Sequence, residues 1–332
     1  MSRPRVAFIG TGGTIASLGA TPLDVQEYGG DGLVLTAEQI VAHFPDVARV
    51  AEVVPVAYKA VPSSRIYFDD WQALAALCLR LEREDPGLAG IVIGHGTGSL
   101  EETAYFLSLT LKVNLPVVIT GSQRPSSALS SDAGLNLVNA LRTAASAEAR
   151  GMGVLVLLND EIHAARDVTK TSTSRMQTFR TADFGALGQA DGDAVTFYRR
   201  PLRRTSPDTE FDVAVLDALP RVDIAYGYTG SDGTAVRAFT AAGAKGLIYA
   251  GFAPGMSTPD DAAAMAEAVA AGVVVMQCTR AGSGRVFRGK KLREAGILVT
   301  DNLTPQKARL LLALALTRSA DPGEIARMFA VY

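Results

Sequence analysis

The chain alternates short runs of β-branched and other apolar residues with longer segments whose apolar positions recur at helical spacing. Continuously apolar strands separated by amphipathic helices are typical of a parallel sheet that is covered by helices on both faces. In the first half of the chain, the predicted strands are 5–9, 53–58, 88–94, 116–120 and 153–158, and the predicted helices are 68–84, 100–111 and 132–147.

A polar, basic stretch that is broken by prolines, residues 198–211, interrupts this alternation and has the composition of a linker. The alternation then resumes with predicted strands at 222–228, 246–251, 272–278 and 296–301 and predicted helices at 233–243, 259–271 and 304–317. The sequence therefore predicts an α/β protein with mainly parallel sheets. Its expected parts are a larger N-terminal domain over 1–197, a linker over 198–218 and a smaller C-terminal domain over 219–332.

Composition narrows the class of protein. The 332 residues carry a net charge of −2, so no general electrostatic attraction to nucleic acid or to an anionic membrane is expected. The N-terminus has no long apolar run of the kind found in signal peptides, and no segment is apolar for long enough to cross a bilayer. We therefore expect a soluble, cytoplasmic protein.

Cysteine and histidine are too few and too scattered for a metal site. Cys78 and Cys278 lie among apolar residues far apart in the sequence, which favours two buried thiols over a disulfide. His43, His95 and His163 do not show metal-ligand spacing. No metal and no organic cofactor are expected.

Candidate chemistry gathers where predicted strands end, because ligands of open α/β sheets bind beyond the carboxyl ends of the strands. The polar side chains at these positions are mostly hydroxyls: Thr11, Thr14, Thr97, Ser99 and Ser122. No histidine–carboxylate pair is evident among them.

The segment "GTGGTIAS" (10–17) places glycines directly after a strand. It is not a dinucleotide fingerprint, because Ile15 stands at the last glycine position, and it is not a P-loop, because no lysine follows. Two interpretations fit the spacing. Either it is a tight turn with a threonine as helix cap, or its glycines let a substrate come close while Thr14 presents a hydroxyl.

Two further segments allow a structural and a chemical interpretation. In "HGTG" (95–98), Thr97 and the following Ser99 fit the start of a helix as caps, and His95 at a strand end fits a structural histidine better than an oxyanion-hole donor. In "RDVTKTSTSRMQTF" (166–179), Lys170 is either solvated or, if it is desolvated beside a threonine, a general base. Together the signals describe an amidohydrolase that uses threonine chemistry.

Over almost its whole length, the chain resembles the bacterial-type L-asparaginases and glutaminase-asparaginases. The resemblance rests on five motifs: "TGGTIA" (11–16), "HGTGSLEETAYFL" (95–107), "GSQRPSSALSSDAGLNLVNA" (121–140), "LVLLNDEIHAARDVTKTSTSRMQTF" (155–179) and "LTPQKARLLLALALT" (303–317). It implies a two-domain asparaginase-like fold and hydrolysis of a side-chain amide to an acid and ammonia through an acyl-enzyme. It also implies a homotetramer, a dimer of intimate dimers, in which the neighbour's C-terminal domain completes each site.

The resemblance assigns roles residue by residue. Thr14 corresponds to the nucleophile, Tyr28 to the tyrosine that activates it, and Thr97 with Lys170 to the pair that handles water. Ser63 corresponds to the serine that holds the substrate carboxylate. The predicted substrate-binding positions are Gly13, Ser63, Ser64, Gly96, Gly98 and Ser122.

The chain departs from the family pattern around the amine-binding part of the site. The family has an aspartate after the second threonine, which binds the substrate α-amino group and contacts the lysine, whereas this chain has Gly98. The family turn "AGxGNGN" is "AGFAPGM" (250–256) here, with Pro254 in place of asparagine. The stretch 284–296 is basic and offers no clear acid where some homologues supply a glutamate.

The favoured hypothesis is an asparaginase-family amidohydrolase with altered specificity, whose substrate is a small carboxylic-acid amide without an α-amino group. One alternative is an ordinary L-asparaginase in which Glu101, Glu102 or a neighbouring subunit replaces the missing aspartate. The other is a non-enzymatic binding or regulatory protein, against which the presence of all four predicted catalytic residues argues.

Overall fold

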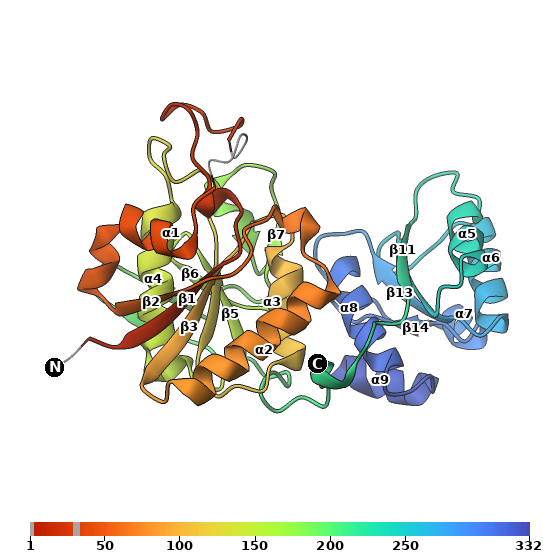
Figure 1. Ribbon diagram of the computed structural model, residues 1–332. Coiled ribbons are helices and arrows are strands. Elements are labelled where there is room, and N and C mark those ends of the chain that lie inside the picture. The colour runs from red at the N-terminus through yellow and green to blue at the C-terminus, as the bar shows by residue number, and fades with distance from the viewer. Residues whose placement is uncertain (1–2, 29–33) are drawn as a thin grey trace. The chain divides into compact units, whose positions relative to one another are not determined.

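A computed structural model describes residues 3–28 and 34–332, which form two compact units, Met1–Ala214 and Val215–Tyr332 (Figure 1). Within these residues no helix is long and apolar enough to cross a membrane. Each unit is an α/β structure built on its own sheet. The stretch 198–214, predicted as part of a linker, belongs to the first unit, where the Ser206 N–H donates to the Ser108 carbonyl (2.8 Å).

In the described part of the first unit, eight strands form one sheet in the order β10-β9-β6-β5-β4-β3-β1-β2. The parallel strands are β1 (Arg5–Gly10), β2 (Glu52–Val56), β3 (Leu88–Gly94), β4 (Val117–Thr120) and β5 (Val154–Leu158). The antiparallel edge consists of β6 (Glu161–Ala164), β9 (Gly188–Ala190) and β10 (Val195–Phe197). The predicted strands of this half are all present, within a few residues of their predicted ends.

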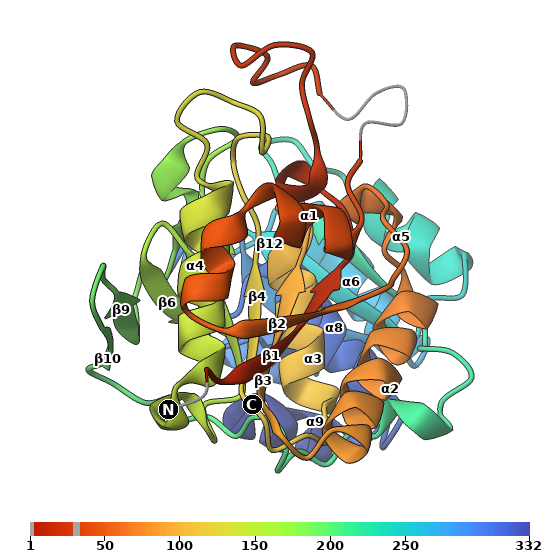
Figure 2. The same ribbon diagram turned by 60° about the vertical axis from the view of Figure 1, so that its left-hand side comes forward.

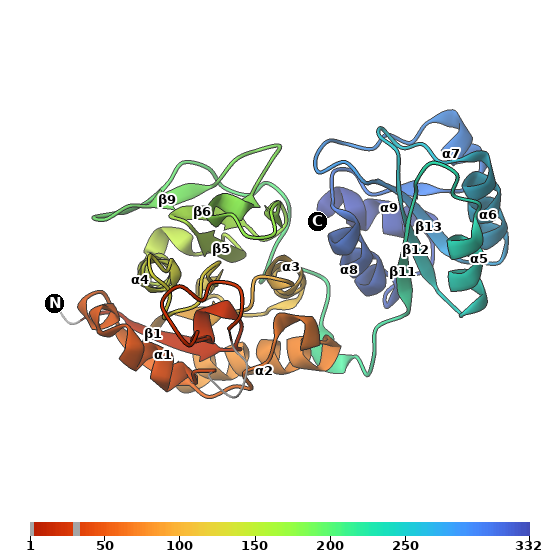
Figure 3. The same cartoon turned by 90° about the horizontal axis from the view of Figure 1, so that it is seen from above.

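Helices cover both faces of this sheet, as the continuously apolar strands predict. Figure 1 shows α1 (Ala37–His43) and α4 (Ala133–Ala145) on one face and α2 (Phe68–Glu84) and α3 (Leu100–Thr110) on the other. Seen from above in Figure 3, α4 and α3 lie on opposite sides of β5. Nearly every residue of α3 is buried, and α2 packs against it through the stacked rings of Trp71 and Phe106.

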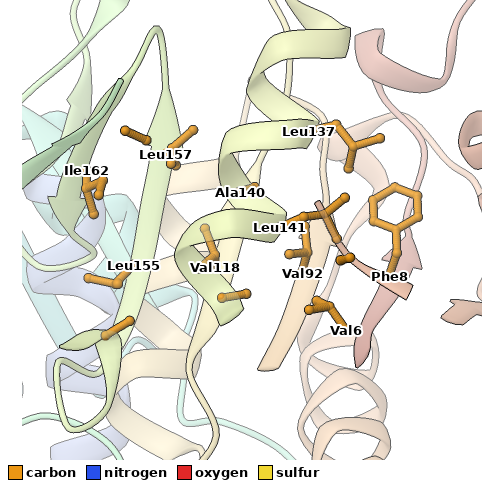
Figure 4. Close-up of a cluster of buried hydrophobic side chains, with 14 of the residues drawn as sticks. Val6, Phe8, Val92, Val118, Leu137, Ala140, Leu141, Leu155, Leu157 and Ile162 are labelled. Atoms are coloured by element: carbon orange, nitrogen blue, oxygen red, sulfur yellow. The ribbon is translucent and has the colours of Figure 1, made fainter. Parts of the chain in front are cut away.

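The core on the α4 face depends on helical spacing. Leu137, Ala140 and Leu141 stand at i, i+3 and i+4 of α4 and point at the sheet, where Val92 and Val118 meet them (Figure 4). All five side chains are fully buried. The contact of α4 with the centre of the sheet is therefore a main source of the stability of this unit.

We expect Leu141→Ala to lower the free energy of unfolding by about 2–5 kcal/mol, because it removes buried methyl groups and leaves a cavity in the core. The measurement is chemical denaturation followed by circular dichroism. Leu79→Ala is the matched control, since Leu79 on α2 is 45% exposed and its truncation is expected to change stability by less than about 0.5 kcal/mol. Equal effects of the two substitutions would contradict the role assigned to the α4 face.

The antiparallel edge agrees with the expectation of a mainly parallel sheet, although its own strands were not predicted. A two-residue hairpin joins β5 to β6, and its central residues Asn159 and Asp160 have φ values of 52° and 64°. Asparagine and aspartate tolerate this left-handed region better than other non-glycine residues. Two side chains of α4 stabilise the turn: Asn136 Oδ1 accepts from the Asn159 N–H (2.9 Å), and Asn139 Nδ2 donates to Asp160 Oδ1 (2.8 Å).

In the second unit, four parallel strands lie in the order β11-β12-β13-β14. They are β11 (Val222–Tyr226), β12 (Gly246–Gly251), β13 (Val274–Thr279) and β14 (Leu298–Val299). The helices are α5 (Thr234–Ala241), α6 (Pro259–Ala270), α7 (Lys290–Glu294), α8 (Pro305–Leu316) and α9 (Pro322–Val331). Leu247 and Tyr249 of β12 pack against α5 and α6, while a Cβ at Gly246 would lie 2.7 Å from Leu312 of α8, so this sheet is also covered on both faces.

Candidate active site

Two glycine-containing turns meet beyond the carboxyl ends of the parallel neighbours β1 and β3. The Thr11 N–H donates to the Gly94 carbonyl (2.9 Å), which joins the starts of the two turns. Gly13 has φ 82°, and a Cβ atom there would lie only 2.1 Å from Cα of Gly96. Only glycine at position 13 allows both this backbone conformation and this close approach. The topology therefore brings "TGGT" and "HGTG" into direct contact.

Thr14 begins a short 3₁₀ turn, Thr14–Ala16, directly after Gly13. Its Oγ1 lies 3.0 Å from the hydroxyl oxygen of Tyr28, and both side chains are half-buried. Tyr28 is in the segment that follows this turn, and that segment extends beyond the carboxyl ends of the strands (Figure 2). The predicted nucleophile and its predicted activator are thus within hydrogen-bonding distance.

Thr97 and Lys170 form the second hydroxyl pair. Lys170 Nζ donates to Thr97 Oγ1 (2.8 Å), and Thr97 is only 6% exposed. Lys170 is held by the short antiparallel pair of β7 (Thr169–Lys170) with β8 (Phe179–Arg180). The capping interpretation of this turn is wrong: no side chain caps α3, and the Ser99 hydroxyl instead donates to the Ser63 carbonyl (2.7 Å).

Burial lowers the pKa of Lys170 below its ordinary value, because desolvation disfavours the ammonium form, and the nearby Glu101 carboxylate opposes this shift. Glu101 is buried in the first turn of α3, and its Oε1 accepts a hydrogen bond from the Lys170 backbone N–H (3.3 Å). A lysine with a lowered pKa beside a threonine hydroxyl is suited to accept a proton from it.

The remaining predicted binding positions differ in burial and in their contacts. Ser63 is half-buried, and its Oγ lies 3.0 Å from where a Cβ on Gly96 would stand and 2.9 Å from where one on Gly98 would stand. Ser64 is exposed. Ser122 is fully buried, and its hydroxyl donates to the Arg124 carbonyl (2.7 Å) within its own turn. The contacts thus bring Ser63, Gly96 and Gly98 together.

His95 is a fully buried histidine whose two ring nitrogens both have polar partners, the Gly96 carbonyl and the Thr103 hydroxyl. The sequence suggested a structural role for His95, but it did not point to Thr103 or to Trp71 behind it. Throughout residues 3–28 and 34–332, no group of three or more His, Cys, Asp or Glu side chains is placed to hold a metal ion.

Sequence profiles of known families cover both units. The profile described as "Asparaginase, N-terminal" matches residues 5–203, and that described as "Glutaminase/Asparaginase C-terminal domain" matches residues 221–329. The chain therefore belongs to the asparaginase family and is an enzyme of the class that hydrolyses linear amides. The homotetramer stays a prediction from the resemblance.

Individual relatives agree with this assignment. The chain is 40% identical to L-asparaginase 2 of Bacillus subtilis (strain 168), over 99% of this chain and 87% of that protein. It is 37% identical to the glutaminase-asparaginase of Pseudomonas fluorescens biotype A, over 98% of this chain and 90% of that protein. The solved structure of a probable cytoplasmic L-asparaginase from Campylobacter jejuni superimposes with a TM-score of 0.94 at 35% identity, covering 99% of this chain and 100% of that one.

Proposed function

We propose that the protein hydrolyses the amide of a small carboxylic acid to the acid and ammonia through a threonine acyl-enzyme. The observation that carries the proposal is the contact of the two turns at Gly13 and Gly96, each of which leads directly to a hydroxyl with a proton-accepting partner. One hydroxyl serves as nucleophile and the other serves the water step, so a single site supplies both half-reactions.

In the first half-reaction, Thr14 Oγ1 attacks the amide carbon while its proton passes to the Tyr28 oxygen, 3.0 Å away, and the Tyr28 hydroxyl proton moves on to the amide nitrogen. The tetrahedral intermediate then collapses. The C–N bond breaks, the nitrogen leaves with this proton as ammonia, and the acyl group stays on Thr14 as an ester. Backbone N–H groups of the turn at Thr97 stabilise the oxyanion, as fixed donors do in other acyl-transfer enzymes.

In the second half-reaction, water attacks the ester carbon and the bond to Thr14 Oγ1 breaks, which releases the carboxylic acid and restores the threonine. Thr97 Oγ1 receives the water proton as its own proton moves to Lys170 Nζ at 2.8 Å. The lowered pKa of Lys170 favours the neutral amine that this transfer requires.

The substrate class follows from position 98. Gly98 carries no side chain, and the nearby Glu101 carboxylate is buried and accepts from the Lys170 backbone N–H. Neither feature suits recognition of a substrate ammonium. We therefore propose an amide without an α-amino group as the preferred substrate, with Ser63 holding its distal carboxylate and L-asparagine as a poorer one.

The test is ammonia release by the purified protein from L-asparagine, D-asparagine, L-glutamine and succinamate, the deaminated analogue of asparagine. Thr14→Ala and Thr97→Ala serve as controls. Turnover of succinamate with little turnover of L-asparagine would support the proposal. Strong turnover of L-asparagine that both controls abolish would refute the altered specificity, and a folded protein that is silent on every amide would favour a non-enzymatic role.

Restoring the aspartate tests the amine pocket directly. We expect Gly98→Asp to raise the preference for L-asparagine over succinamate, measured as the ratio of kcat/KM values, by about 10- to 100-fold. This gain is expected because the new carboxylate would accept a charge-assisted hydrogen bond from the α-ammonium group of L-asparagine, which succinamate does not have. The Ser63 hydroxyl must turn aside, because a Cβ at position 98 would lie 2.9 Å from its oxygen.

Gly98→Asn is the matched control for this substitution. It adds a side chain of the same size without the charge, so it is expected to leave the preference close to that of the unmodified protein. Equal gains from aspartate and asparagine would mean that shape rather than charge sets the preference.

A further inference from the structure

A chain of three side chains lies behind the turn between β3 and α3, and the half-reactions above make no use of it. Trp71 Nε1 donates to Thr103 Oγ1 (2.9 Å), Thr103 Oγ1 lies 3.0 Å from His95 Nε2, and His95 Nδ1 lies 2.8 Å from the Gly96 carbonyl oxygen. Thr103 and His95 are completely buried, and Trp71 is 7% exposed. These hydrogen bonds thus connect α2 through α3 to the turn that carries Thr97.

The direction of every bond in this chain is determined by its ends. A carbonyl oxygen can only accept, so His95 Nδ1 carries the proton and donates it to Gly96. His95 Nε2 is then the acceptor for the Thr103 hydroxyl, whose oxygen in turn accepts from Trp71. Burial lowers the pKa of His95 from its ordinary value of 6.5 to about 4, so the ring is neutral at pH 7.

The bond to Gly96 determines where the next N–H points. The Gly96 carbonyl and the Thr97 N–H belong to one planar trans peptide group, in which the two bonds point in opposite directions. Holding the carbonyl against the buried imidazole therefore turns the Thr97 N–H away from it. In the part of the chain that the structure describes, this N–H makes no hydrogen bond to another protein group.

We propose that His95 is a positioning residue that fixes the Gly96–Thr97 peptide so that the Thr97 N–H faces the oxyanion of the amide being hydrolysed. The inference rests on the proposed function for the nature of that oxyanion. Gly96 is already confined on its other side by Gly13 and by Ser63. The hydrogen bond from His95 therefore prevents the Gly96–Thr97 peptide group from rotating about the backbone bonds on either side of it.

Two near-isosteric substitutions separate the two ends of the ring. In His95→Asn, the amide nitrogen can occupy the place of Nδ1 and still donate to Gly96. In His95→Gln, the amide reaches the place of Nε2 and keeps the Thr103 contact, but the donor to Gly96 is lost. We expect His95→Gln to lower kcat by about 10- to 100-fold with little change in KM, and His95→Asn to retain most of the activity.

The measurements are steady-state kinetics on the amide that the unmodified protein turns over best and crystal structures of both variants. Fluorescence of Trp71, the single tryptophan of the chain, reports whether the core around it is intact. Equal losses in the two folded variants, or a change confined to KM, would overturn the inference. If the unmodified protein hydrolyses no amide, the proposed function fails. The crystal structures then decide: a Gly96–Thr97 peptide rotated in His95→Gln but retained in His95→Asn supports the positioning role, and an unchanged peptide in both refutes it.

Discussion

Thr14→Ala is expected to lower kcat on the best amide substrate by at least about 10³-fold while the protein stays folded. Thr14 Oγ1 is the hydroxyl that forms the acyl-enzyme in the proposed reaction, and it is hydrogen-bonded to the Tyr28 hydroxyl. Removing it leaves the substrate-binding groups in place but takes away the bond-forming atom. Ammonia release under saturating substrate, compared with thermal unfolding of the same preparation, measures the effect.

Thr14→Ser is the matched control, because it keeps the hydroxyl and removes only a methyl group. It is expected to retain far more activity than Thr14→Ala. Mass spectrometry of the protein after rapid acid quenching offers a second measurement, since an acyl group on Thr14 adds the mass of the substrate acid minus water. Activity of Thr14→Ala close to that of the unmodified protein would contradict the assignment of the nucleophile.

The parallel part of the fold was predictable because burial leaves a simple signature in sequence. The strands β3 and β12, and β1 after Arg5, consist of apolar residues and glycine since helices cover both of their faces, and their predicted bounds are nearly those observed. The antiparallel edge was missed because its strands are short and only partly apolar. The one sequence feature typical of this edge is Asn159-Asp160 between two apolar runs, which fits the two-residue hairpin that joins β5 to β6.

The site was only partly accessible to local reasoning. At Thr97 the spacing before a helix fits a cap as well as a catalytic hydroxyl, and the residue that decides between them, Lys170, is 73 positions away in the sequence. A contact between residues so far apart in the sequence cannot be predicted from the local spacing of residue types. The same holds for Gly13, whose need for glycine comes in part from Gly96, in the turn after β3. Resemblance supplied the pairing of these residues, and the topology gives its physical reason.

Lys170 is the second position at which a large loss is expected. Lys170→Met and Lys170→Arg should both lower kcat by about 10²–10⁴-fold if the neutral amine accepts a proton from Thr97. Arginine can keep the positive charge and a hydrogen bond to the 2.8 Å neighbour, but it stays protonated and cannot serve as the base. Near-normal kcat in Lys170→Arg would show that the charge, and not the basicity, matters.

The assignment of Lys170 as a general base also predicts the direction in which kcat changes with pH. Because burial lowers the pKa of Lys170, the active neutral amine persists to lower pH than for an ordinary lysine, and kcat should fall as pH falls through that lowered pKa. The same shift makes the unfolded state bind more protons between the folded and unfolded pKa values, so stability rises with pH across that window. Lys170→Met removes this cost of burying an ammonium. It should therefore lose the lysine-dependent part of the rate profile while unfolding at no lower temperature than the unmodified protein at neutral pH, which separates a chemical defect from a folding defect.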